Sequence, residues 1–274
     1  MAKIDRLGWA AGLAFEAYGL RIGVRTNDAD VAERLDSCLP PSSTRIDGPF
    51  VDYLLSLRVG KPSGDGRAKF FHLLYAGLTR VARSLVWDDV VRRVENEVDL
   101  YVGEHAKDRV FVHAGVVGWQ GKAIVLPGHS FSGKSTLVSE LLRAGATFYS
   151  DEFAVLDDRG YVHPYPRPVS MRTQEGQFDR DVPPAEYGAA VGTEPLPVGL
   201  VALAAYQPGA RWQPRELRPA RSIVELIQNS LPMMAYPART LAALENAVRD
   251  ARHVKGVRGE AAETAAALLR QIDP

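Results

Sequence analysis

The chain has 274 residues, a formal net charge of zero, 46% hydrophobic residues and 24% charged residues. This length accommodates one large domain or two small ones, and the apolar content is sufficient for a buried core. Proteins that bind nucleic acids or anionic membranes generally carry a basic excess, so the balanced charge argues against both kinds of partner. Cys38 is the only cysteine, which excludes an intrachain disulfide and a thiolate metal cluster.

The hydropathy of the chain indicates neither a signal peptide nor a membrane span. Residues 1–6 lack the apolar core of a signal peptide, and no stretch approaches 18 uninterrupted apolar residues. We therefore expect a cytoplasmic protein.

The first part of the chain, residues 1–97, is expected to form a small α+β region without recognisable chemistry. Period-two alternation and breaker residues predict its elements. These are strands over 13–15, 18–24 and 53–59, helices over 28–39 and 88–97, and a loop over 60–66.

The second part, residues 98–274, is expected to be a P-loop domain. We predict strands over 98–102, 110–117, 122–126, 147–156, 161–163 and 198–206, and helices over 135–143, 222–231, 240–252 and 259–272. Two hairpins are expected, one joining 110–117 to 122–126 and one around the turn at 157–160. The polar segment 174–192 has no period and is expected to be a loop.

A glycine-rich loop between the strand at 122–126 and the helix at 135–143 is the most informative feature. It matches G-x-x-x-x-G-K-S, the phosphate-binding P-loop pattern, in the required strand–loop–helix context. Backbone N–H groups and the helix N-terminus would hold phosphates, Lys134 would reach the β- and γ-phosphates, and the Ser135 hydroxyl would bind Mg²⁺. The predicted nucleotide-binding residues are Gly128, His129, Ser130, Phe131, Ser132, Gly133, Lys134, Ser135 and Thr136.

Two acidic residues follow the P-loop lysine closely. Asp151 and Glu152 interrupt an otherwise apolar strand, where a carboxylate without a partner is costly. Only one helix, a turn and one short strand fit between Lys134 and Asp151. That strand is expected to place Asp151 beside the γ-phosphate, where it can accept a proton from an incoming hydroxyl or bind metal. The alternative is a solvated acidic turn.

Three further residues are weaker candidates. His113 lies on the strand that pairs with the P-loop strand, where a satisfied core histidine is the alternative interpretation. Arg167 and Arg172 flank a proline-rich segment and could neutralise a transferring phosphoryl group, although surface arginine is the default.

The run from His113-Ala-Gly115 through the P-loop to Asp151-Glu152 resembles the catalytic domain of HPr kinase/phosphorylase, a bacterial serine kinase. The resemblance covers residues 100–172 well and 198–272 weakly. It implies the fold shared with phosphoenolpyruvate carboxykinases, ATP and Mg²⁺ as cofactors, and phosphoryl transfer to a serine hydroxyl. It also implies that Asp151 is the general base, that Gly128 to Thr136 hold the phosphates, that Ser135 binds the metal and that His113 is an active-site partner of the carboxylates. Together with Lys134 from the P-loop and the acidic pair, the predicted catalytic residues are Asp151, His113 and Lys134, and the predicted metal ligands are Ser135, Asp151 and Glu152.

Two departures from that family narrow the expectation. Its second acid is an aspartate, whereas Glu152 is one methylene longer, and its later glycine-rich signature is not found. These differences argue against a bifunctional kinase/phosphorylase acting on HPr itself. The expected acceptor is a serine-type hydroxyl of a protein, a peptide or a small molecule.

Other functions stay open at this stage. One is a nucleotide-sensing regulatory module that transfers no phosphate, and another is a small-molecule kinase or a carboxykinase-like enzyme. The carboxykinase alternative would usually need a second metal site, for which the sequence has no ligand cluster. The donor (ATP, GTP or pyrophosphate) and homo-oligomer formation are also undecided.

Overall fold

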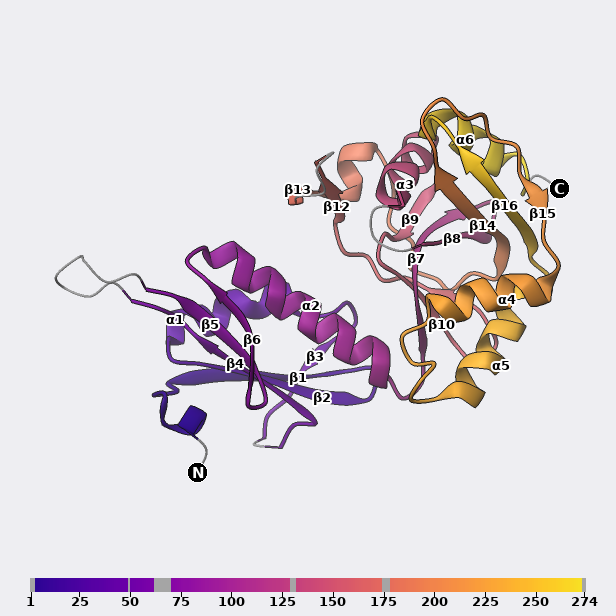
Figure 1. Ribbon diagram of the computed structural model, residues 1–274. Coiled ribbons are helices and arrows are strands. Elements are labelled where there is room, and N and C mark those ends of the chain that lie inside the picture. Colours follow the sequence, from indigo (N-terminus) through magenta and orange to yellow (C-terminus); the bar gives the residue numbers. More distant parts are fainter. Residues whose placement is uncertain (1–2, 49, 62–69, 129–131, 174–177, 273–274) are drawn as a thin grey trace. The chain divides into compact units, whose positions relative to one another are not determined.

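The computed structural model describes residues 3–48, 50–61, 70–128, 132–173 and 178–272 (Figure 1). The chain forms two compact units, Met1–Lys107 and Asp108–Pro274. Both units combine helices with β-sheet. The six-stranded sheet of the first unit and the eight-stranded sheet of the second each contain parallel and antiparallel pairs, so the mixed α/β class is confirmed. Along the chain, the boundary between the units falls between Lys107 and Asp108, whereas the sequence predicted it between residues 97 and 98. No described helix combines the length and the apolarity needed to cross a lipid bilayer.

The first unit is built on a six-stranded sheet with the order β3-β1-β2-β4-β5-β6. Its strands are β1 (Ala11–Ala17), β2 (Leu20–Thr26), β3 (Thr44–Arg45), β4 (Tyr53–Arg58), β5 (His72–Ala76) and β6 (Thr79–Ser84). The β2–β4 pair is parallel and the other pairs are antiparallel. The β5–β6 hairpin was not predicted, because residues 70–84 carry no clean alternation of apolar and polar residues.

Helix α2 (Trp87–His105) corrects the prediction of a strand over 98–102. Valines recur at four-residue spacing at positions 90, 94, 98 and 102, and all four are buried. In isolation, the last two suggest a β-strand, but their spacing continues the buried face of the helix. Helix α1 (Ala29–Arg34) is also shorter than expected, since a 3₁₀ turn follows at Leu35–Cys38.

The second unit is built on an eight-stranded sheet with the order β11-β10-β7-β8-β14-β16-β15, and β9 also pairs with β7. Its strands are β7 (Val110–Trp119), β8 (Lys122–Pro127), β9 (Thr147–Ser150), β10 (Phe153–Leu156), β11 (Val162–His163), β14 (Val198–Tyr206), β15 (Arg215–Glu216) and β16 (Arg252–Arg258). Both predicted hairpins are confirmed, as β7 pairs with β8 and β10 pairs with β11, each antiparallel. Strand β14 lies parallel to both β8 and β16.

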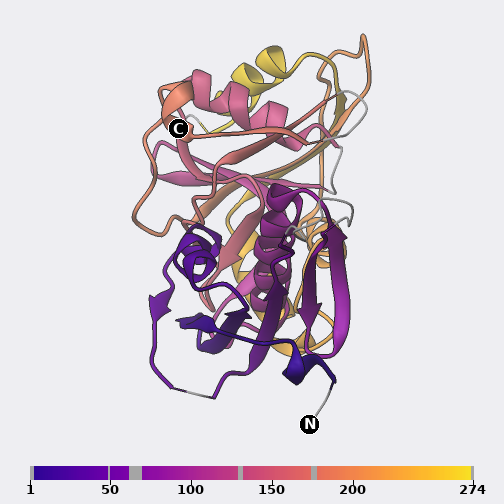
Figure 2. The same cartoon turned by 90° about the vertical axis from the view of Figure 1, so that its left-hand side faces the viewer.

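Helices cover both faces of this sheet. On one face, α3 (Lys134–Arg143) and α6 (Ala261–Leu269) bury their apolar side chains in one core cluster, and Figures 1 and 2 show them side by side. On the other face, α4 (Pro219–Gln228) and α5 (Pro237–Val248) contribute to a second cluster. Because each buried Leu or Val stabilises the fold by about 1.5–3 kcal/mol, these clusters fix the start of α3 against the sheet.

Two segments of this unit differ from the sequence-based expectation. Part of the predicted loop 174–192 forms β13 (Phe178–Val182), which pairs with β12 (Val169–Arg172), and a 3₁₀ turn follows at Pro184–Tyr187. The predicted helix over 240–252 ends at Val248, and β16 begins at Arg252. Strand β16 was missed because its short apolar–polar alternation directly follows a long helical pattern.

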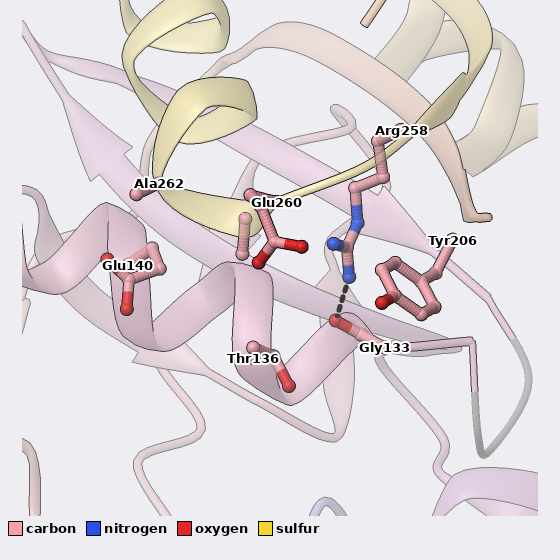
Figure 3. Close-up of a pocket in the computed structure, with 8 residues that line it drawn as sticks. Gly133, Thr136, Glu140, Tyr206, Arg258, Glu260 and Ala262 are labelled. Carbon is pink, nitrogen blue, oxygen red and sulfur yellow. Dashed lines mark hydrogen bonds between the residues drawn. The ribbon is translucent and has the colours of Figure 1, made fainter. Parts of the chain in front are cut away.

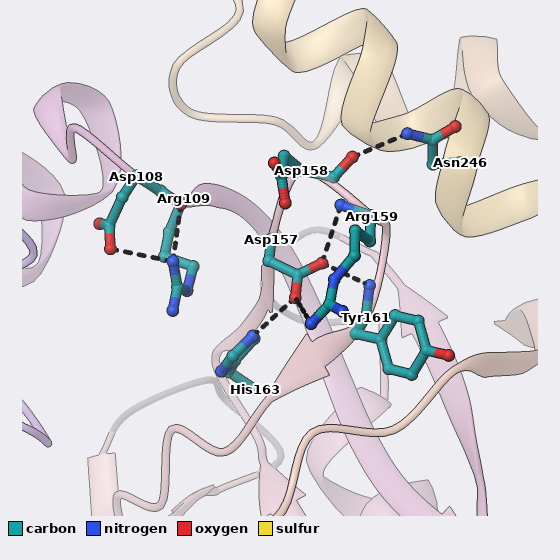
Figure 4. Close-up of polar contacts among 8 residues, drawn as sticks. All are labelled: Asp108, Arg109, Asp157, Asp158, Arg159, Tyr161, His163 and Asn246. Carbon is teal, nitrogen blue, oxygen red and sulfur yellow. Dashed lines mark hydrogen bonds and ion pairs between the residues drawn. The ribbon is translucent and has the colours of Figure 1, made fainter.

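The turn between β10 and β11 is held by the buried carboxylate of Asp157 (Figure 4). Its Oδ1 accepts hydrogen bonds from the backbone N–H groups of Arg159 (3.0 Å) and Tyr161 (2.9 Å), while Oδ2 is 3.1 Å from His163 Nε2. Burial alone would raise the pKa of Asp157, but these hydrogen bonds outweigh it and lower the pKa. The cluster is therefore a structural turn motif that needs no ligand to satisfy it.

Asp157→Ala should destabilise the second unit by about 2–4 kcal/mol, because it leaves two backbone donors and a histidine without their acceptor. Equilibrium urea denaturation measures this loss. The matched control is Asp158→Ala, an exposed neighbour whose backbone carbonyl, which accepts from Asn246 Nδ2, is retained. A loss for Asp157→Ala no larger than that of the control would contradict the structural role.

Candidate active site

Three segments of the second unit meet at the N-terminus of α3: the middle of β7, the first turn of α3, and the break between β9 and β10. Strands β9 and β10 both pair with β7, and the pairs on either side of the break are Val116 with Ser150 and His113 with Phe153. The register of β9 shifts by one residue between Val116 and Val117. Asp151 and Glu152 therefore lie between these pairs, beside the centre of β7. The sheet places the acidic residues next to the strand that carries His113, as expected.

Lys134 runs against β7 because residue 115 is glycine. A Cβ built on Gly115 would lie 2.6 Å from Val138 Cγ2 and 3.2 Å from Lys134 Cγ, both closer than side chains normally approach. The glycine thus lets α3 pack directly on the strand. This gives a physical reason for the glycine in the His113-Ala-Gly115 run.

The Lys134 ammonium lies inside a polar cluster. Its Nζ is 3.3 Å from the Gly128 carbonyl oxygen and 3.5 Å from each ring nitrogen of His113, so it rests against the imidazole rather than on one nitrogen. Burial lowers the pKa of Lys134, and the nearby carboxylates of Glu152 and Asp151 oppose that effect. A cation held in this way can bind phosphate oxygens as a point charge.

His113 is oriented by the chain at Glu152. Its Nδ1 is 2.8 Å from the Glu152 carbonyl oxygen, and because a carbonyl only accepts, this contact assigns the proton to Nδ1. The Glu152 carboxylate is 3.5 Å from the same nitrogen and about half exposed. His113 thus belongs to the polar cluster around Lys134. Its hydrogen bond to the Glu152 carbonyl oxygen is also what the alternative of a satisfied core histidine predicts, so its catalytic role stays a prediction.

Asp151 is buried, with 6% of its surface exposed, and contacts the first turn of α3. The Ser135 hydroxyl donates to Asp151 Oδ2 at 2.7 Å, while Oδ1 is buried without a hydrogen-bond partner among the described residues. Burial raises the pKa of Asp151 to about 7, against the opposing effects of the Ser135 hydrogen bond and the Lys134 charge. The alternative of a solvated acidic turn is therefore wrong for Asp151.

The donor set around Asp151 is suited to Mg²⁺. Mg²⁺ binds through one or two carboxylates together with substrate phosphates and water, and rarely through an all-protein cage. Ser135 Oγ and the buried, unpartnered Asp151 Oδ1 provide such oxygens, with the exposed Glu152 carboxylate nearby. The described part of the chain holds no cluster of three or more His, Cys, Asp or Glu side chains suited to a metal, so Mg²⁺ binding here stays a prediction.

The raised pKa of Asp151 predicts how stability depends on pH in EDTA. Because the folded-state pKa of about 7 lies above the ordinary 3.8, the stability linked to this carboxyl is fully present below about pH 4 and is lost as the pH rises through about 7. Asp151→Asn removes that loss. The variant should therefore gain roughly 2–3 kcal/mol more stability over wild type at pH 8 than at pH 5.

Chemical denaturation at the two pH values measures this difference. Asp158→Asn, an exposed carboxylate only a few residues away, is the matched control and should show the same small change at both. A pH-independent effect of Asp151→Asn would show that Asp151 is already ionised at pH 5 in the folded protein.

The other predicted residues are less informative. His129, Ser130 and Phe131 lie outside the described residues, as does the side chain of Arg172. The guanidinium of Arg167 lies 5.9 Å from the ring centre of Tyr165.

Sequence reasoning missed Arg258, at the end of β16. It is 2% exposed, and its Nη2 donates to the Gly133 carbonyl at 2.7 Å, immediately before α3 (Figure 3). The local signals were the alternation of apolar and polar residues along β16 and the glycine that follows it, Gly259. These signals are weak, because β16 is short and contains a histidine and a lysine.

The comparisons with known proteins do not add a family: no family model matches the chain, and no curated protein sequence matches it.

Proposed function

We propose that this chain is a phosphotransferase of the HPr kinase type, which transfers the γ-phosphate of ATP to a serine-type hydroxyl of a protein, peptide or small molecule. The carrying observation is the group formed by Lys134, Ser135 and Asp151 at the start of α3, with the Ser135 hydroxyl 2.7 Å from a buried carboxylate. The β8–loop–α3 arrangement and the neighbouring His113 support the same conclusion.

Each residue has a role that follows from its surroundings. Lys134 and the backbone N–H groups at the start of α3 bind the β- and γ-phosphates. Asp151 accepts the proton of the acceptor hydroxyl while the oxygen of that hydroxyl forms a bond to the γ-phosphorus. The bond between the γ-phosphorus and the β,γ-bridging oxygen breaks, and ADP is released. His113, with Nδ1 held by the Glu152 carbonyl oxygen, lies against Lys134 with both ring nitrogens 3.5 Å from Nζ and steadies the ammonium.

Mg²⁺, when bound at Ser135 and Asp151, would neutralise charge on the phosphates. Its positive charge would also lower the pKa of Asp151 and so oppose the effect of burial. The carboxylate would then be ionised when donor and metal are both present, which is the state that a general base requires.

A labelling experiment tests the proposal. The purified protein is incubated with Mg²⁺ and ATP labelled in the γ-phosphate, and the label is followed across proteins, peptides and metabolites of a cell lysate. One serine-containing species should acquire the label in proportion to the amount of protein added. Tight ATP binding with no label transferred to any fraction would instead favour the nucleotide-sensing module.

A further inference from the structure

The six-stranded sheet of the first unit has its helices on one face only. Helix α2 packs against β5 and β6, and α1 packs against β1 and β2 (Figure 1). The leucines of β4 and β5 that face these helices have no exposed surface. On the opposite face, the β1–β2 end is occupied, because Arg25 pairs with Asp5 and its guanidinium lies over the ring of Trp9. The part of that face formed by β4, β5 and β6 has no such cover among the described residues of this unit.

The strand register places three arginines on this uncovered part. Leu73 on β5 lies between Arg58 on β4 and Arg83 on β6. In a neighbouring row, Tyr75 pairs with Arg80. A register shift gives β6 one extra residue between these two rows, so Arg80 and Arg83 share a face although they are three residues apart. Together these five residues form the basic face of the first unit.

The charges of this unit are segregated. All charged side chains of β4, β5 and β6 are basic, and the three arginines are exposed. None of the three forms a salt bridge within the described part of the chain, and the Arg83 guanidinium lies 3.7 Å from the ring centre of Phe71. Helix α2, on the other side of the sheet, carries six acidic and two basic residues. An acidic ligand therefore matches the basic face and no other part of this sheet.

The charge of the unit as a whole favours an acidic protein segment over a nucleic acid. Residues 1–107 include 15 basic and 15 acidic side chains, so the unit has no net positive charge. Nucleic-acid binding depends on neutralising many phosphates and is usually accompanied by a basic excess. A few carboxylates spaced along a peptide need only the local cluster of arginines.

Strand β6 is also an edge of the sheet. Among the described residues it pairs with β5 alone, so the N–H and C=O groups along its outer side can pair with another strand. Exposed apolar side chains lie at both of its ends, Leu78 before it and Leu85 and Val86 after it. A second copy of β6 would bring arginines against arginines, and like charges on paired strands are destabilising. A strand with acidic side chains meets no such repulsion.

We propose that an extended acidic segment of a partner protein binds here by adding a strand beside β6. Side chains of a strand alternate between its two faces, so every second residue of the added segment lies on the same side as the basic face. Acidic side chains at those positions pair with Arg80 and Arg83, while backbone hydrogen bonds to β6 supply affinity. The inference concerns the first unit and does not depend on the proposed function.

Fluorescence anisotropy tests this inference with the full chain and a labelled octapeptide of alternating glutamate and valine. Wild type should bind this peptide and should not bind the same peptide with lysine in place of glutamate. Combining Arg80→Glu with Arg83→Glu should weaken binding of the glutamate peptide at least about 10-fold and create binding of the lysine peptide. The matched control combines Arg218→Glu with Arg221→Glu, two exposed arginines of the second unit that are also three residues apart, and should change neither result.

Two further probes distinguish strand addition from attraction between charges alone. A peptoid carries the same side chains on its nitrogens and has no N–H groups, so it should bind at least about 10-fold more weakly than the peptide. A labelled oligothymidylate of matching charge should also bind more weakly. Failure of wild type to bind the glutamate peptide, equal affinity for the peptoid, or tighter binding of the oligothymidylate would overturn the inference. Because Arg80 and Arg83 are exposed, their substitution is expected to leave the fold intact, which circular dichroism checks.

Discussion

Asp151→Asn should bind ATP and fail to transfer its γ-phosphate. Asparagine has nearly the same shape and can still accept the Ser135 hydrogen bond, which is 2.7 Å long in the wild type. It cannot accept a proton from the acceptor hydroxyl, and loss of a general base typically slows a reaction about 10²–10⁴-fold. The transfer rate should fall by that factor, while the affinity for ATP in EDTA changes by less than about 10-fold, since the phosphates are bound mainly by Lys134 and the α3 N-terminus.

Single-turnover transfer from labelled ATP to the identified acceptor measures this effect without interference from product release. Asp158→Asn removes an exposed carboxylate from the adjacent turn and should retain the wild-type rate. If Asp151→Asn transfers phosphate normally, Asp151 is not the base, and the half-exposed Glu152 carboxylate becomes the next candidate.

The candidate site was predictable to the extent that its residues are close in sequence. One hairpin, one glycine loop and one helix separate His113 from Asp151, so a local pattern of strand, turn and helix already brings them together. The structure adds the reason for Gly115, the 2.7 Å contact between Ser135 and Asp151, and the burial that raises the pKa of that carboxyl. All three features depend on how closely α3 packs on β7. The spacing of apolar residues along the sequence does not specify that distance.

Arg258 shows where sequence reasoning failed. It is 125 residues beyond Gly133 in the chain, and the two meet only because β14 lies parallel to both β8 and β16. A parallel pairing has no short turn to signal it, since its strands are joined by long connections that contain helices. The strand predicted over 98–102 failed for the opposite reason: these five residues taken alone favoured β-structure, whereas the valine spacing over residues 90–102 continued a helix.

Lys134→Ala should remove most of the ATP affinity. The ammonium lies 3.3 Å from the Gly128 carbonyl oxygen and 3.5 Å from each His113 ring nitrogen, and it is partly withdrawn from solvent. Removing a charged donor from a site that binds phosphate costs about 2–4 kcal/mol, equivalent to a loss of about 30–1000-fold. Lys122→Ala is the matched control, because Lys122 is an exposed lysine at the start of the strand that enters the loop.

A second measurement distinguishes loss of the phosphate contact from general damage to the site. The Lys134 charge lowers the pKa of Asp151, so its removal should raise that pKa further. In EDTA, the stability of Lys134→Ala should therefore continue to fall with rising pH beyond about 7, where the wild-type contribution from Asp151 levels off. Wild-type ATP affinity combined with this altered pH dependence would place Lys134 beside Asp151 but outside the phosphate site, and the P-loop assignment would then be wrong.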